Sequence, residues 1–262
     1  MNPPVHGGRG WGVVAMVTGA AALVLAAGWL GPGGGPRVAG RRLAVWLGEL
    51  GAAPVVEGHP ALRAVEEQDQ AIRAGAAFQA VAAAGPAAMP FLWERLREPD
   101  PRWQGWVERL PGMPRKFTTG WQRRLQAGLG FYALGEAGRP AWPGLAACLT
   151  NGTHPVEATW ALLGGGTQAI PALVAGLACT NDGVVVSASA WGLGWLGPAA
   201  REAAPALAAV LSAPAPSAGD EALRLRALAR IDISLDHLLP AIRQRLDSNR
   251  PPLVYALKEI LE

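Results

Sequence analysis

A Gly-x-Gly-x-x-Gly motif at Gly192, Gly194 and Gly197 is the clearest candidate for chemistry in this chain. Dinucleotide-binding sites use such glycines between a strand and a helix, with an acidic residue ~20 positions further on. The run Val184–Val186 precedes the motif, and Asp220 follows at about that distance. However, the glycines close a helical segment, and Asp220 begins another segment beyond a proline-rich loop. We therefore interpret the glycines as helix-packing and turn residues, and we expect no cofactor.

Nucleophiles and metal ligands are scattered along the chain. Ser187 and Ser189 lack a surrounding Gly-x-Ser-x-Gly turn, and no pair of carboxylates has a spacing suited to acid–base catalysis. Cys148 and Cys179 are interpreted as small buried hydrophobes, with a disulfide between them as the alternative. The histidines are isolated, at His6, His59, His154 and His237. The sequence therefore predicts neither an enzyme active site nor a metal site.

Basic side chains alternate with indoles over residues 95–124, which carry a modest excess of positive charge. Such segments can bind nucleic-acid backbones or anionic lipid headgroups. The plainer interpretation is a solvated face whose indoles pack on neighbouring helices. If a partner binds this chain, we expect the contact to lie here. The candidate contact residues are Trp103, Trp106, Arg115, Lys116, Arg123 and Arg124.

A proline-headed pattern, Pro-x-Leu-x-x-x-Leu with Ile allowed once, organises the chain beyond residue 60. Its last three copies are spaced by about 35 residues, and self-similarity at such a period is typical of repeat proteins. The two apolar residues lie four apart on one helical face, and proline is tolerated in the first turn of a helix. Each copy therefore predicts the start of a helix. The copies begin at Pro90, Pro143, Pro171, Pro205 and Pro240.

Each proline-headed helix, helix B, follows a glycine-rich or polar break and an Ala- and Leu-rich helical segment, helix A. The repeat unit is therefore helix A, short turn, helix B. The first interval between prolines is longer than the others, which predicts an insertion at about 99–119. The expected A helices span 66–84, 120–134, 155–163, 184–196 and 219–231. The expected B helices span 87–98, 140–149, 169–179, 202–212 and 235–247, and a capping helix spans 253–261.

The turns inside these pairs resemble those of HEAT repeats, in particular the short bacterial type called PBS-lyase HEAT-like repeats. Leu134–Gly138 and Leu196–Ala200 match that family's Leu-Gly-x-x-Gly and Gly-Pro-x-Ala turns. The resemblance implies an all-α fold, an α-solenoid of about five helix pairs with a C-terminal capping helix. It says little about chemistry, although some proteins of this kind attach bilin chromophores to other proteins. The family's ladder of Asp and Arg residues near the start of helix A has one counterpart here, Asp220 with Arg224.

The segment Trp11–Leu30 contains no charged residue. At ~1.5 Å per residue it can span a ~30 Å hydrocarbon core, with Trp11 and Trp29 at the two interfaces. A cleaved signal peptide and a buried helix are the alternatives, but the apolar region of a signal peptide is usually ~7–15 residues. Flanking arginines favour a cytoplasmic repeat domain slightly, whereas similar anchored bacterial proteins place such domains outside the cytoplasm. We expect a single-pass membrane protein with its repeats on the periplasmic side.

The expected organisation has four parts: a tail over 1–10, a transmembrane helix over 11–30, a Gly/Pro-rich tether with a lead-in helix over 31–60, and a repeat domain over 61–262. Half of the residues are hydrophobic but only 6% are aromatic, so Ala, Leu and Val must fill most of the interior.

We expect this chain to be a membrane-tethered scaffold that binds a protein partner and performs no catalysis. One alternative is an enzyme or enzyme accessory of the PBS-lyase-like kind, which a cofactor or a reactive cysteine would reveal. The other is a nucleic-acid-binding solenoid, since the formal charge is +3 and the pI is about 9.3. Its affinity would fall steeply with salt, and the membrane anchor argues against it. A small-molecule substrate is not expected.

Overall fold

The computed structural model describes residues 34–52, 65–99, 120–212 and 217–231. The chain divides into two compact units, Met1–Gly35 and Pro36–Glu262, and nearly all described residues belong to the second. Several predictions lie outside the described residues: the membrane span over 11–30, the helices over 235–247 and 253–261, and the candidate contacts Trp103, Trp106, Arg115 and Lys116.

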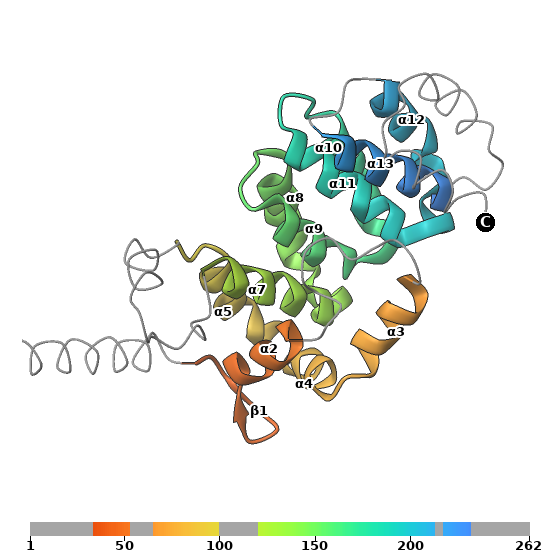
Figure 1. Cartoon of the computed structure of the whole chain (residues 1–262). Helices are drawn as coiled ribbons and strands as arrows, with labels where there is room; N and C mark the ends of the chain where they lie inside the picture. The colour runs from red at the N-terminus through yellow and green to blue at the C-terminus, as the bar shows by residue number, and fades with distance from the viewer. Residues whose placement is uncertain (1–33, 53–64, 100–119, 213–216, 232–262) are drawn as a thin grey trace, which may run out of the picture. The chain divides into compact units, whose positions relative to one another are not determined.

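The described part of the chain is almost entirely helical, which confirms the all-α class (Figure 1). A two-stranded antiparallel hairpin, β1 (Arg37–Val38) and β2 (Arg41–Arg42), leads into the first helix. The α-helices are α2 (Leu43–Gly51), α3 (Val65–Ala74), α4 (Ala76–Ala84), α5 (Met89–Leu96), α7 (Gly120–Leu134), α8 (Trp142–Thr150), α9 (Pro155–Leu163), α10 (Ile170–Leu177), α11 (Gly183–Leu196), α12 (Ala204–Ser212) and α13 (Ala218–Ile231). The 3-10 helices are η1 (Gly85–Ala88), η2 (Gly135–Ala141), η3 (Gly166–Ala169) and η4 (Gly197–Ala203).

The proline-headed helices begin where the sequence predicts. In α5, α8, α10 and α12 the repeat proline is the second residue of the helix, where no backbone N–H is required. The pattern's leucines in the four described copies are at most 2% exposed. They are Leu92, Leu96, Leu145, Leu149, Leu173, Leu177, Leu207 and Leu211.

A 3-10 turn precedes each of these helices and opens on a glycine with positive φ. The four glycines are Gly85, Gly135, Gly166 and Gly197. A side chain at such a φ would clash with its own backbone, so glycine is the residue that allows this turn. The turns η1 and η3 span 4 residues, whereas η2 and η4 span 7.

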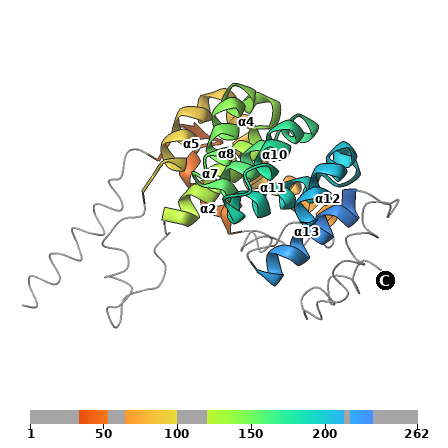
Figure 2. The same ribbon diagram turned by 90° about the horizontal axis from the view of Figure 1, so that it is seen from above.

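The helices contact one another in two series. In the first, α7 packs on α9, α9 on α11, and α11 on α13; in the second, α8 packs on α10 and α10 on α12. The series are joined because each proline-headed helix packs on the next helix along the chain: α5 on α7, α8 on α9, α10 on α11 and α12 on α13. Figure 2 shows the helices of this unit following one another from α4 and α5 to α12 and α13.

The Gly-x-Gly-x-x-Gly motif has the packing and turn roles that we expected. A Cβ built on Gly192 would lie 2.7 Å from Cγ2 of Thr159, so only glycine lets α11 approach α9 here. The carbonyl oxygen of Gly194 accepts a 2.9 Å hydrogen bond from Nε of Arg230. Gly197 has a φ of 59° and ends the helix.

The first expected A helix is broken. The sequence predicts one helix over 66–84, but α3 ends at Ala74 and α4 begins at Ala76. Gly75 between them is extended, with φ −65° and ψ 137°. Glycine is costly inside a helix because it gives up the most backbone freedom, and here the chain turns at it instead.

One helical run in the described residues, Ala76–Leu96, is long and apolar enough to cross a membrane by length and composition. It consists of α4, η1 and α5, with a bend at Gly85. Val81 and Leu92 within it are fully buried, so the run uses its apolar face in packing.

The folded unit begins inside the stretch expected to be a tether. The hairpin pairs Arg37 with Arg42, and Nε1 of Trp46 donates a 2.9 Å hydrogen bond to the carbonyl oxygen of Val38. Arg41 forms a 2.5 Å ion pair with Glu49, which fastens the hairpin to α2. α2 in turn packs on α4 and α7.

Candidate functional site

Basic side chains gather where α5 ends and α7 begins, the two helices that border the predicted insertion. Arg97 is exposed and lies 4.9 Å from the ring centre of Trp93. Arg123 is 28% exposed, with its Nε 3.3 Å from a carboxylate oxygen of Glu98. Trp121, at the start of α7, is 40% exposed. This edge therefore offers a cationic and aromatic surface.

Arg124 is buried, unlike the adjacent Arg123. It is 5% exposed, its Nη1 donates a 3.0 Å hydrogen bond to the carbonyl oxygen of Glu98, and its Nε lies 3.5 Å from the carboxylate of Glu157. Its guanidinium therefore links α7 to α9 and is closed to a partner in this arrangement. Of the two candidate contacts that the structure describes, Arg123 alone keeps access to solvent.

Polar links join helices that pack one on the next in the first contact series. The first is the buried Arg124–Glu157 pair between α7 and α9. A second joins α11 to α13, where Oγ of Ser187 donates a 2.7 Å hydrogen bond to Asp220. Ser187 is 4% exposed. The serine considered as a nucleophile thus serves as a link between helices.

An aromatic row runs through four helices and was not predicted from the sequence. Phe78 of α4 packs against Tyr132 of α7, with ring centroids 5.8 Å apart, and Tyr132 packs against Trp160 of α9 at 5.7 Å. Trp160 then contacts Trp191 and Trp195 of α11 at 4.8 and 5.0 Å. We call these five residues the aromatic row. The only sequence signal was the presence of aromatic side chains in four successive expected A helices.

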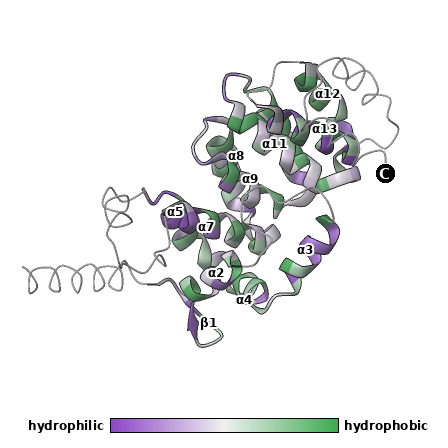
Figure 3. Cartoon of the chain, in the orientation of Figure 1, coloured by the Kyte–Doolittle hydropathy of each residue, from purple (hydrophilic) through white to green (hydrophobic). Residues whose placement is uncertain are grey.

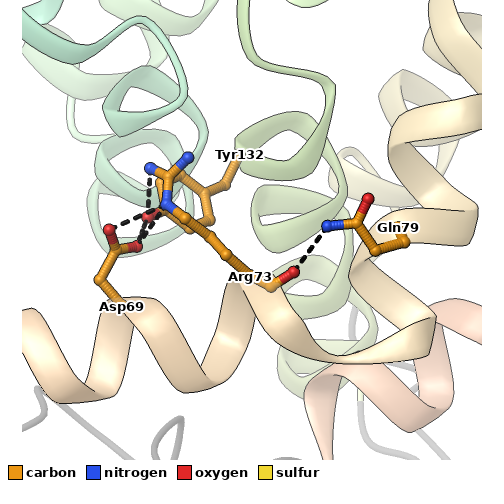
Figure 4. Close-up of polar contacts among 4 residues, drawn as sticks. All are labelled: Asp69, Arg73, Gln79 and Tyr132. Carbon is orange, nitrogen blue, oxygen red and sulfur yellow. Dashed lines mark hydrogen bonds and ion pairs between the residues drawn. The ribbon is translucent and has the colours of Figure 1, made fainter.

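Helix α3 is fastened to the aromatic row at Tyr132 (Figure 4). The Tyr132 hydroxyl donates a hydrogen bond to Asp69, and Nη2 of Arg73 donates to the hydroxyl oxygen at 2.8 Å. Nε of Arg73 lies 2.8 Å from the Asp69 carboxylate, and its guanidinium stands 4.9 Å from the Tyr132 ring centre. Gln79 of α4 donates to the carbonyl oxygen of Arg73. Burial, then the hydrogen bond to Asp69 and its negative charge, raises the pKa of Tyr132.

The other end of α3 is fastened to α13. Nη2 of Arg230 lies 2.5 Å from a carboxylate oxygen of Glu66, and this hydrogen bond is the main reason why the pKa of Glu66 is lowered. Val65 and Ile72, on the same helical face as Asp69, are each 3% exposed. α3 therefore bridges two helices that lie far apart in the sequence.

The cysteines are free and half-buried in the structure. Burial raises the pKa of the Cys148 thiol. Sγ of Cys179 lies 3.5 Å from the carbonyl oxygen of Thr150. Within the described ranges, no group of three or more His, Cys, Asp or Glu side chains could hold a metal ion.

Comparisons with protein-family models, with curated proteins and with solved structures found no match for this chain.

Proposed function

We propose that this chain is a membrane-tethered α-solenoid of HEAT-like helix pairs that acts as a scaffold for a protein partner. The observation that carries the proposal is the serial contact of helices. The helices α7, α9, α11 and α13 pack one on the next, and α8, α10 and α12 form a second series of the same kind. Nearest-neighbour packing of this kind is how repeat proteins build extended binding surfaces.

The partner contact is proposed at the basic edge where α5 ends and α7 begins, together with the insertion that links these helices in the sequence. Arg97, Trp121 and Arg123 supply exposed cationic and aromatic groups there. Insertions in repeat proteins lie on one face, which is often the binding face. A cationic edge fits a partner with an acidic surface, because complementary charge speeds encounter and excludes wrong partners.

The membrane tether is proposed at residues 11–30, with the repeats on the periplasmic side. Deleting 11–30 should move the full chain from the membrane fraction to the soluble fraction. The mass of the mature protein separates the two hypotheses: an anchor leaves the N-terminal segment in place, whereas a signal peptide is removed.

The scaffold is tested by reversing three charges at the proposed edge, Arg115→Glu, Lys116→Glu and Arg123→Glu, in the full chain. Crosslinking in intact cells followed by capture should recover at least about tenfold less of the partner, since like charges across an interface cost several kcal/mol. Arg124 is left unchanged because its burial makes its loss a folding defect.

The matched control reverses three exposed arginines elsewhere, Arg42→Glu, Arg139→Glu and Arg201→Glu. It makes the same change in net charge, so capture should stay at the level of the unaltered chain. Equal capture by both triple variants would count against the basic edge as the contact.

A further inference from the structure

Helix α3 sits on the rest of the fold in the manner of a bound peptide. Its backbone approaches α4, the next helix in sequence, whereas its links to α7 and α13 run through side chains. Only Val65 and Ile72 are buried along its length. Figure 3 shows broad hydrophilic segments in α3. The helix is thus held by one narrow face.

The contacts of α3 define what the receiving surface recognises. Tyr132 and Arg230 present a hydroxyl donor and a cation to Asp69 and Glu66, which lie three positions apart in the helix. Residues three apart share a helical face. Val65 and Ile72 flank these carboxylates and join the same buried apolar cluster as the aromatic row. The surface therefore accepts an amphipathic helix with two carboxylates between two aliphatic residues.

We propose that α3 is an intramolecular ligand of the aromatic row and Arg230, and that an amphipathic helix of the protein partner with the same acidic and aliphatic pattern replaces it. This inference rests on the proposed scaffold function and names the kind of partner helix. Helix-in-surface recognition through a few anchors on one face is a recurrent mode of peptide binding.

The contacts that hold α3 allow it to detach and be replaced by another helix. Gly75 is extended and separates α3 from α4, so α3 can leave without unwinding α4. The Glu66 side chain is 74% exposed and Arg73 is 50% exposed, so these contacts compete with water. Segments with few buried apolar contacts open at low free energy compared with the core.

The test uses the full chain in a mild detergent and a fluorescent peptide that copies residues 65–74. Isolated helices shorter than ~12–15 residues are marginal, so the peptide carries Ala71→Lys joined by a lactam to Glu67. Both positions are exposed in α3. The receiving chain is either unaltered or carries Asp69→Lys and Ile72→Lys on the attaching face, which should release its own α3.

We expect the peptide to bind the released chain at least about tenfold more tightly than the unaltered chain, because α3 in the unaltered chain competes at a high effective concentration. Adding Arg230→Glu to the released chain should weaken this binding, because the introduced carboxylate repels Glu66 of the peptide. A peptide with Arg in place of Glu66 should then restore it. Equal affinity for the unaltered and released chains, or no restoration by the charge-swapped peptide, would overturn the proposal.

Hydrogen exchange on the unaltered chain tests the proposal even if the released variant fails to fold. Amides of α3 should exchange at least about a hundredfold faster than those of α7, and equal protection of the two helices would overturn the proposal. These measurements need no natural partner. If the basic-edge capture experiment fails, the proposed scaffold contact is rejected. The peptide and hydrogen-exchange measurements still decide whether α3 can be replaced.

Discussion

Helices α7 and α3 are held in the same fold by opposite means. From Arg124 to Leu134 every residue of α7 is buried, and the helix packs on α2, α4, α5 and α9. In α3 only Val65 and Ile72 are buried, and the helix is linked to distant helices by these two side chains and a few polar ones. The contrast is between a framework helix buried along most of its length and a helix attached by one narrow face, which underlies the proposal that α3 exchanges.

The largest effect is expected from Arg124→Met, which removes the cation beside Glu157 inside α7 and α9. Glu157 is 3% exposed, and an uncompensated buried charge costs about 3–5 kcal/mol. Urea unfolding of the full chain followed by circular dichroism measures the loss. The double variant Arg124→Met with Glu157→Leu should recover most of it. A loss below about 1 kcal/mol in the single variant would mean that α7 does not depend on this pair.

A smaller loss is expected from Gly128→Ala in α7. A Cβ built there would lie 2.5 Å from the carbonyl oxygen of Glu157, which belongs to the α9 backbone and cannot turn aside. Overpacking of this kind costs about 1–3 kcal/mol. Gly48→Ala in α2 is the matched control, because its Cβ meets nothing within 4 Å. The control should gain about 0.5–1 kcal/mol, since alanine favours the helix.

Tyr132→Phe should loosen α3 and leave α7 in place. It removes the hydroxyl that donates to Asp69, and one such hydrogen bond contributes about 1 kcal/mol. Hydrogen exchange of α3 amides should speed up about fivefold, with α7 amides unchanged. Equal acceleration in both helices would show that α3 belongs to the same cooperative unit as α7.

The same variant should change the alkaline stability of the chain. The pKa of Tyr132 is raised in the folded chain, chiefly by burial, so the folded phenol keeps its proton where an unfolded tyrosine, with a pKa near 10, loses it. The stabilisation is complete below about pH 10 and is lost as the pH rises above it. Unfolding measured from pH 8 to 11 should therefore show a weaker decline for Tyr132→Phe than for the unaltered chain.

The smallest effect is expected from Glu66→Gln. The pKa of Glu66 is lowered, first by the hydrogen bond from Arg230, so this contact stabilises α3 above the carboxyl's usual pKa and weakens as the pH falls below it. Because the side chain is largely exposed, the effect should also shrink with added salt. Exchange of α3 amides compared at pH 3.5 and pH 6 should differ less in the variant than in the unaltered chain.

The ends of the buried helices were predictable because they depend on residue types close by in the sequence. The structure has α7 at 120–134 and α9 at 155–163, as the sequence predicts, since proline and glycine act within a few residues of the helix ends. The break at Gly75 was missed because a single glycine in an Ala-rich run is usually tolerated in a helix. Its effect here is to give α3 a separate position.

The candidate site was less predictable because it depends on contacts between distant residues. Arg124 counted as surface charge in the sequence, whereas its partner Glu157 lies on the next A helix. The link between Glu66 and Arg230 joins residues that are 164 positions apart in the sequence. No local pattern identifies such pairs, so neither the buried arginine nor the attachment of α3 could be read from composition or spacing.

The alternating lengths of the 3-10 turns have a consequence for how this architecture can grow. Short turns at η1 and η3 and long turns at η2 and η4 make successive modules, each a helix, its 3-10 turn and the proline-headed helix that follows, unequal in length at the turn. Duplication or loss of a single module would juxtapose two turns of one length and shift the following helix relative to its neighbour.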